Sequence, residues 1–80
     1  MAFHVCIVDD EPWAAVDAQH SVDWGRFGFK FTRHYSSPAE ALNEIPRMRY
    51  SLILVDIRMP GMDGLELIRR LKEKQVDAHF

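Results

Sequence analysis

The chain is poor in cysteine and long apolar runs, and it has no linker or low-complexity tract. Its single cysteine, Cys6, cannot form an internal disulfide, which indicates a reducing compartment. No apolar run approaches the ~18 residues that a membrane span needs. Acidic residues at positions 9–11 interrupt the short apolar start, so the chain shows no signal-peptide pattern. We therefore expect a cytoplasmic location and no membrane partner.

An excess of basic charge is also missing. Lys and Arg number 10 and Asp and Glu number 12, which gives a net charge of −2. This balance argues against a broad basic surface for nucleic acid or anionic lipid. Hydrophobic residues make up 48% and charged residues 28%, as in a folded globular chain. With 80 residues, the chain must fold compactly, gain a partner or be part of something longer, because so small a core rarely supplies more than ~3–5 kcal/mol.

Three segments have strand character. Phe3–Val8 and Leu52–Val55 are almost continuously apolar, which is typical of strands buried on both faces. Residues 29–33 alternate between apolar and polar side chains and predict an edge strand with one solvated face. The apolar residues 78–80 predict the start of a fourth strand.

Each of the first two strands is followed by a helix signal. Pro12 and Pro38 suit the first helical position, where the missing N–H of proline is not needed. Ser37 with Glu40 forms a capping-box pattern. Pro46 is expected to end the second helix nearby.

A third helix is predicted after the third strand. Asp63 can cap its start, and Leu65, Ile68 and Leu71 are expected to line its buried face, with Leu67 beside them. The resulting order β-α-β-α-β-α predicts an α/β fold with a parallel sheet and right-handed crossovers. In such sheets, the functional site lies at the carboxyl ends of the strands.

Aspartates stand at two of these strand ends. Asp9 and Asp10 follow the first strand, and Asp56 follows the third. If those strands are neighbours, three carboxylates share one pocket, which is unfavourable unless a cation balances them. Oxygen ligands favour a hard ion such as Mg²⁺, and a carboxylate beside Mg²⁺ can act as a nucleophile toward a phosphoryl group. The residues alone thus suggest phosphoryl transfer to an aspartate.

The stretches VCIVDDE at 5–11 and LILVDIRMPGMDG at 52–64 resemble the receiver (CheY-like) domain of bacterial two-component response regulators. The resemblance covers Phe3 to Phe80 and implies a flavodoxin-like doubly wound sheet of order 2-1-3-4-5. Residues 21–24 with 27–29 are similar to receivers that precede AraC-type DNA-binding domains. This implies an output in transcription regulation, with DNA contacted only through a further domain.

The resemblance also implies residue roles. Asp56 would accept a phosphoryl group from a sensor histidine kinase. Asp10 and Asp56 would ligate Mg²⁺ together with the backbone carbonyl of Arg58, while Asp9 would contact the ion through water. Such a domain is a switch module and not itself an enzyme.

The chain departs from the family in length. A receiver repeats its βα unit five times, whereas this sequence ends as strand four begins, without the later Ser/Thr and Lys that contact the phosphoryl group. We therefore expect residues 1–80 to be the N-terminal part of a receiver, holding strands 2-1-3. The third strand, residues 52–55, would then offer an unpaired edge that invites dimerisation or strand exchange.

Other interpretations of the same residues compete with this one. The acids at 9–11 could simply favour a helix N-terminus. A magnesium-dependent phosphatase usually needs a second acid two residues after the nucleophile, and Arg58 stands there. A nucleotide or flavin site would need a glycine- or hydroxyl-rich loop after the first strand, where this chain is acidic. A non-phosphorylated interaction or assembly module stays open as the alternative function.

Overall fold

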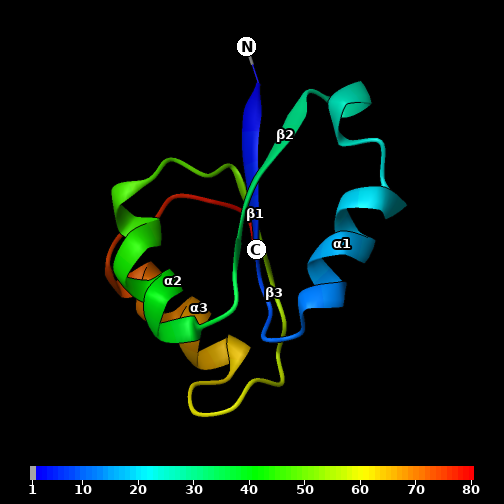
Figure 1. Cartoon of the computed structure of the whole chain (residues 1–80). Helices are drawn as coiled ribbons and strands as arrows, with labels where there is room; N and C mark the ends of the chain where they lie inside the picture. The colour runs from blue at the N-terminus through cyan, green and yellow to red at the C-terminus, as the bar shows by residue number, and fades with distance from the viewer. Residues whose placement is uncertain (1) are drawn as a thin grey trace.

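The computed structural model describes residues 2–80 and contains one three-stranded parallel sheet of order β2-β1-β3. Helix α1 lies on one face of the sheet, and α2 and α3 lie on the other (Figure 1). No helix in this range is long and apolar enough to cross a membrane. The elements are β1 (Phe3–Val8), α1 (Pro12–Ser21), the 3-10 turn η1 (Trp24–Phe27), β2 (Phe29–Tyr35), α2 (Pro38–Glu44), the 3-10 turn η2 (Ile45–Arg47), β3 (Leu52–Val55) and α3 (Gly64–Glu73). The predicted α/β fold with a parallel sheet is confirmed.

The three strands end at the same level. Val8, the last residue of the central strand, pairs with Tyr35 of β2 and with Val55 of β3. The residues that follow β1 and β3 therefore meet at one edge of the sheet. The register between β1 and β2 shifts once, between Val5 and Cys6, so that Cys6 pairs with Arg33.

Strand β2 lies at the edge of the sheet, as the sequence predicts, and runs two residues further than the predicted end at position 33. The other edge requires a correction. Strand β3 is not unpaired over its whole length, because Leu52 forms a parallel bridge with His79. The Ile53 N–H donates to the His79 carbonyl (2.8 Å), and the His79 N–H donates to the Ser51 carbonyl (3.0 Å). The chain can turn back along β3 because Gln75 adopts a left-handed conformation just after α3 (φ 63°).

The helix starts follow the expected signals. Pro12 and Pro38 open α1 and α2. The Ser37 hydroxyl accepts the Glu40 N–H (3.3 Å), and the Asp63 carboxylate accepts the Glu66 N–H (2.8 Å). These side chains satisfy backbone donors that have no partner within the helix.

The buried face of α3 differs from the prediction, because Ile68 is only half-buried and Leu65 is exposed. Leu67 and Leu71 are fully buried, whereas Leu65 is 62% exposed. The reason is the close packing of Gly64 against the turn after β3, which sets the buried line of the helix at positions 64, 67 and 71. Leu65 falls outside this line and faces away from the core.

The hydrophobic core lies between the sheet and the pair α2 and α3. Its buried members are Cys6, Val8, Tyr35, Ala41, Ile45, Tyr50, Ile53, Met59, Leu67 and Leu71. On the opposite face, α1 buries only Ala15. The end of the sheet that carries the aspartates is thus anchored mainly from the α2–α3 side.

Candidate functional site

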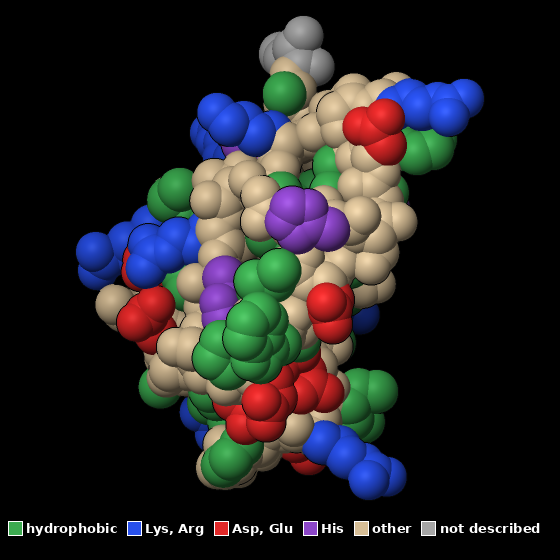
Figure 2. Space-filling model, turned by 45° about the vertical axis from the view of Figure 1, so that its right-hand side comes forward, with side chains coloured by type: hydrophobic (Ala, Val, Ile, Leu, Met, Phe, Trp, Pro, Cys, Tyr) green, Lys and Arg blue, Asp and Glu red, His purple; other side chains and the backbone are tan. Residues whose placement is uncertain are grey.

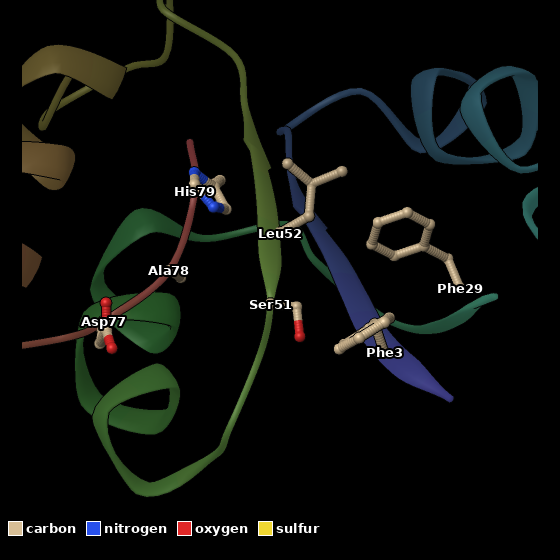
Figure 3. A pocket seen from close by; sticks show the side chains of 7 residues that line it. All are labelled: Phe3, Phe29, Ser51, Leu52, Asp77, Ala78 and His79. Carbon is tan, nitrogen blue, oxygen red and sulfur yellow. The ribbon is translucent and has the colours of Figure 1, made fainter. Parts of the chain in front are cut away.

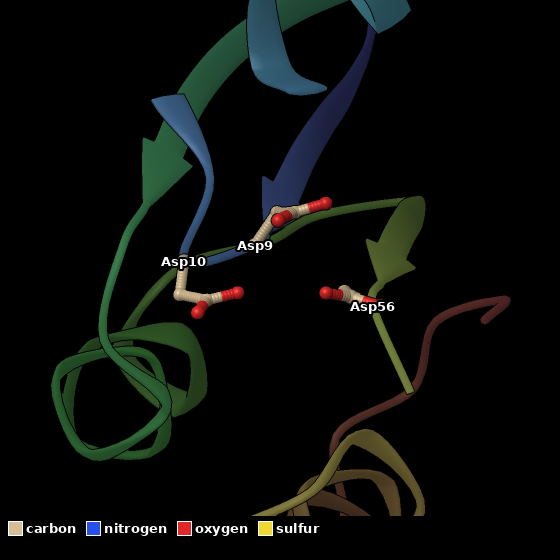
Figure 4. Close-up of side chains that lie close together, drawn as sticks. All are labelled: Asp9, Asp10 and Asp56. Carbon is tan, nitrogen blue, oxygen red and sulfur yellow. The ribbon is translucent and has the colours of Figure 1, made fainter. Parts of the chain in front are cut away.

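The three predicted aspartates lie together at the carboxyl ends of β1 and β3. Figure 4 shows the side chains of Asp9, Asp10 and Asp56 converging on one space. Each offers a carboxylate oxygen, and these oxygens all lie within 4.8 Å of one another. The three residues are half-buried, and acidic side chains form one red patch at this end of the molecule (Figure 2). The arrangement leaves the carboxylates accessible from solvent.

Asp9 is held by three hydrogen bonds. Its N–H donates to the Tyr35 carbonyl (3.0 Å), and its Oδ1 accepts the N–H of Glu11 (2.9 Å). Its carbonyl oxygen lies 2.7 Å from Nε2 of His34, which must donate because a carbonyl only accepts. The sequence interpretation missed His34, since nothing in the spacing of the histidines links it to Asp9.

Asp56 is positioned by one hydrogen bond to β1 and one to the loop that follows β3. Its N–H donates to the Val8 carbonyl (2.9 Å), and its Oδ1 accepts the N–H of Arg58 at 3.2 Å. Arg58 itself is exposed, so this backbone contact brings residue 58 next to the acidic cluster.

Gly64 lets α3 approach the end of β3 closely. A Cβ at this position would lie 2.2 Å from the backbone oxygen of Asp56, which no side chain could tolerate. The Gly64 N–H donates to the Ile57 carbonyl (2.8 Å) and ties the helix start to the strand end. The sequence interpretation placed residue 64 in a loop motif without giving this reason.

The acidic cluster has no basic partner among residues 2–80. Arg33 pairs with Glu40 and Glu44, and the arginines of α3 pair with acids on their own helix; none of the ion pairs reaches Asp9, Asp10 or Asp56. Three neighbouring carboxylates without a positive side chain are suited to a cation. Their oxygen ligands fit a hard divalent ion such as Mg²⁺.

The cysteine does not offer a competing nucleophile. Cys6 is fully buried in β1, and burial raises the pKa of its thiol from 9.0 to about 12. The thiol therefore stays protonated at neutral pH, and a protonated thiol is a poor nucleophile.

A second hollow lies at the other end of the sheet. It has a volume of about 550 Å³ and is lined by Phe3, Phe29, Ser51, Leu52, Asp77, Ala78 and His79 (Figure 3). Its walls are mainly apolar, and the acidic cluster is not among them. The carboxyl ends of the strands therefore remain the best candidate site.

Comparison with known proteins gives one consistent family. The pattern described as "Response regulator receiver domain" matches residues 5–79. The solved receiver domain of AraT, a response regulator from Geobacillus stearothermophilus, is 34% identical with a TM-score of 0.86, covering 99% of this chain and 61% of that chain.

Two curated relatives match most of this chain but only a part of their own length. The transcriptional regulatory protein FixJ of Bradyrhizobium diazoefficiens is 28% identical over 90% of this chain and 34% of its own length. A protein-glutamate methylesterase/protein-glutamine glutaminase of Hahella chejuensis is 41% identical over 88% of this chain and 20% of its own length. The chain thus spans about a fifth to a third of these curated relatives.

Proposed function

The chain belongs to the response regulator receiver domain family, and on that premise we propose that it is a phosphoacceptor switch module of a two-component system. In this proposal, Asp56 accepts a phosphoryl group from a sensor histidine kinase. Mg²⁺ would be held by Asp10, Asp56 and the backbone carbonyl of Arg58, with Asp9 contacting it through water. The supporting observation is the convergence of three carboxylates within 4.8 Å, none of which forms an ion pair among residues 2–80.

The proposed reaction uses few groups of the chain. A carboxylate oxygen of Asp56 attacks phosphorus, forming a P–O bond while the P–N bond of a phosphohistidine breaks. The departing imidazole nitrogen keeps the electron pair of that bond and is neutralised by a proton. The N–H of Arg58 contacts Oδ1 (3.2 Å) and so orients the carboxylate. A bound Mg²⁺ would supply charge neutralisation for the incoming group.

The output of the switch is proposed from the relatives. FixJ is named a transcriptional regulatory protein, and the Hahella relative is named an esterase, so similar domains occur with different outputs. We favour transcription regulation, which the name of FixJ supports. DNA would be contacted by a further domain, because the chain itself carries a net charge of −2 and so offers no broad basic surface. An AraC-type output domain, a cytoplasmic location and a position as the N-terminal part of a receiver remain predictions from the sequence.

The test is the intact mass of the chain after incubation with Mg²⁺ and an acyl phosphate donor. We expect a gain of one phosphoryl group, which disappears in Asp56→Asn and when the metal is chelated. Asp63→Asn is the matched control, because Asp63 caps α3 outside the cluster and asparagine also caps helices. A phosphorylated Asp56→Asn variant would contradict the assignment.

The alternative is an interaction module that works without phosphorylation. It is favoured by the partly paired edge of β3 and by the apolar hollow beside it, which could serve contact with a second copy. Sedimentation velocity would show a concentration-dependent dimer. A folded chain that dimerises but neither binds Mg²⁺ nor gains mass would support this alternative over the switch.

A further inference from the structure

Resting on the proposed function, we propose that His34 is a positioning residue that fixes the loop carrying Asp9 and Asp10. His34 lies on β2, opposite Ile7 of β1, and is half-buried. Its Nε2 lies 2.7 Å from the carbonyl oxygen of Asp9, the first residue after β1. The contact joins two residues that are 25 positions apart in the sequence.

The side chain of His34 supplies a hydrogen bond at the point where the ladder between β1 and β2 ends. The Asp9 N–H still donates to the Tyr35 carbonyl in the manner of a parallel ladder. The next ladder bond would bring a backbone N–H of β2 to the Asp9 carbonyl, but β2 ends at Tyr35 and the chain turns into α2. The imidazole supplies the missing donor, so both polar groups of the Asp9 backbone are bonded to β2.

This bond also constrains Asp10. The Asp9 carbonyl and the nitrogen and Cα of Asp10 lie in one planar peptide unit. Holding the carbonyl therefore fixes the direction in which the chain leaves toward Asp10, whose carboxylate belongs to the cluster. No side-chain hydrogen bond of Asp10 is seen among residues 2–80, so the orientation of this residue depends on the backbone before it.

His34 acts on the ligand through one peptide unit and does not contact the metal position itself. Removing a group that orients a metal ligand typically weakens metal binding or activity by about 10–100-fold. Because the effect of His34 passes through the backbone, we expect the lower end of this range. The donor can be either the neutral Nε2–H tautomer or the imidazolium, so the role does not depend on the charge of the ring.

Two variants separate hydrogen bonding from packing. His34→Gln keeps an N–H that can reach the carbonyl, whereas His34→Leu fills similar space without a donor. Mg²⁺ affinity would be measured by isothermal titration calorimetry, which needs no reporter side chain. His4→Leu is the control, since His4 bonds Thr32 near the opposite end of β1.

We expect His34→Leu to weaken Mg²⁺ binding and acyl phosphate-dependent phosphorylation by about tenfold. His34→Gln should stay close to the unmodified chain, as should His4→Leu. Equal Mg²⁺ affinity of His34→Leu and the unmodified chain would overturn the positioning role, as would a folded His34→Gln that binds as weakly as His34→Leu. An unmodified chain that neither binds Mg²⁺ nor is phosphorylated would instead contradict the proposed function itself.

A measurement on the unmodified chain covers the case in which His34→Leu does not fold. Nitrogen-15 NMR of the histidine rings at alkaline pH distinguishes the two neutral tautomers. We expect the Nε2–H tautomer for His34, because its Nε2 faces a carbonyl oxygen. The Nδ1–H tautomer would place two lone pairs against each other and would refute the proposal.

Discussion

The two faces of the sheet are covered to different extents, mainly over β3. On the face toward α2 and α3, Cys6, Val8 and Ile53 are completely buried in one continuous core. On the face toward α1, Val5 and Ile7 are buried, but Leu52 is only partly covered and lines the open hollow. Alternate residues of the same strand therefore experience different surroundings. The stability of the fold therefore depends mainly on the face toward α2 and α3. Helix α3 on this face also begins in close contact with the backbone of Asp56.

The largest expected effect on the free energy of unfolding is seen by comparing substitutions at two neighbouring residues of β3. Ile53→Ala removes a fully buried side chain and should lower the free energy of unfolding by about 2–5 kcal/mol. Leu52→Ala, on the hollow side, should cost only about 1 kcal/mol because the side chain is already partly solvated. Urea denaturation followed by circular dichroism measures both, and equal losses would break the comparison.

Gly64 gives the next effect, on both stability and the site. In Gly64→Ala the new Cβ must move the backbone of Asp56, 2.2 Å away, and we expect a loss of about 1–3 kcal/mol. The phosphorylation proposed for Asp56 should slow as well. Gly25→Ala is the control on the other side of the sheet, where a Cβ meets nothing within 4 Å. A Gly64→Ala variant with normal stability and phosphorylation would show that the α3 start is freer than the structure indicates.

The third effect concerns a hydrogen bond between two buried tyrosines on the face toward α2 and α3. The hydroxyls of Tyr35 and Tyr50 are 2.9 Å apart, and burial raises the pKa of both phenols. Tyr50→Phe should cost about 1–2 kcal/mol, because it leaves the hydroxyl of Tyr35 buried without a partner. Replacing both tyrosines should cost less than the sum of the single changes. A double-mutant cycle of urea midpoints tests this, and strict additivity would argue against a shared hydrogen bond.

The smallest effect concerns the thiol of Cys6 at alkaline pH. Its folded pKa is raised to about 12 from 9.0, so the unfolded chain loses the proton first as the pH rises. Stability is therefore fully present below pH 9 and falls above it, by about 0.8 kcal/mol at pH 9.5 from this group alone. The stability difference between the unmodified chain and Cys6→Ala should shrink by this amount from pH 7.5 to 9.5. A difference that stays constant would mean that the thiol is solvated in the folded state.

Much of the fold could be predicted because apolar runs end sharply at aspartates. The bounds of β1 and β3 agree with the sequence interpretation, and the same aspartates are brought together in the structure. The end of β2 was predicted too early, because Arg33 stands where the alternation calls for an apolar side chain, and the apolar position returns only at Tyr35. The exposure of Leu65 was missed since helical spacing alone allows several buried faces, and the contact of Gly64 selects one.

The bond between His34 and Asp9 was beyond sequence reasoning for a different reason. It depends on the register of β1 and β2, which shifts between Val5 and Cys6. Because side chains alternate between faces, a shift of one residue changes which of them point toward the neighbouring loop. Neither strand contains a residue that marks such a shift, so the partner of Asp9 emerges only from the paired structure.

The central place of β1 sets the order of events during synthesis of the chain. β1 is made first, but one of its neighbours ends at Tyr35 and the other at Val55. At about 5–20 residues per second, the ribosome needs roughly 2–9 seconds to add the 47 residues from Asp9 through Val55. Throughout that time, at least one edge of the apolar strand β1 has no neighbouring strand to pair with. The nascent chain is therefore most prone to incorrect strand pairing before β3 has been synthesised. The acidic residues just after β1 limit the length of the apolar segment that is exposed during this time.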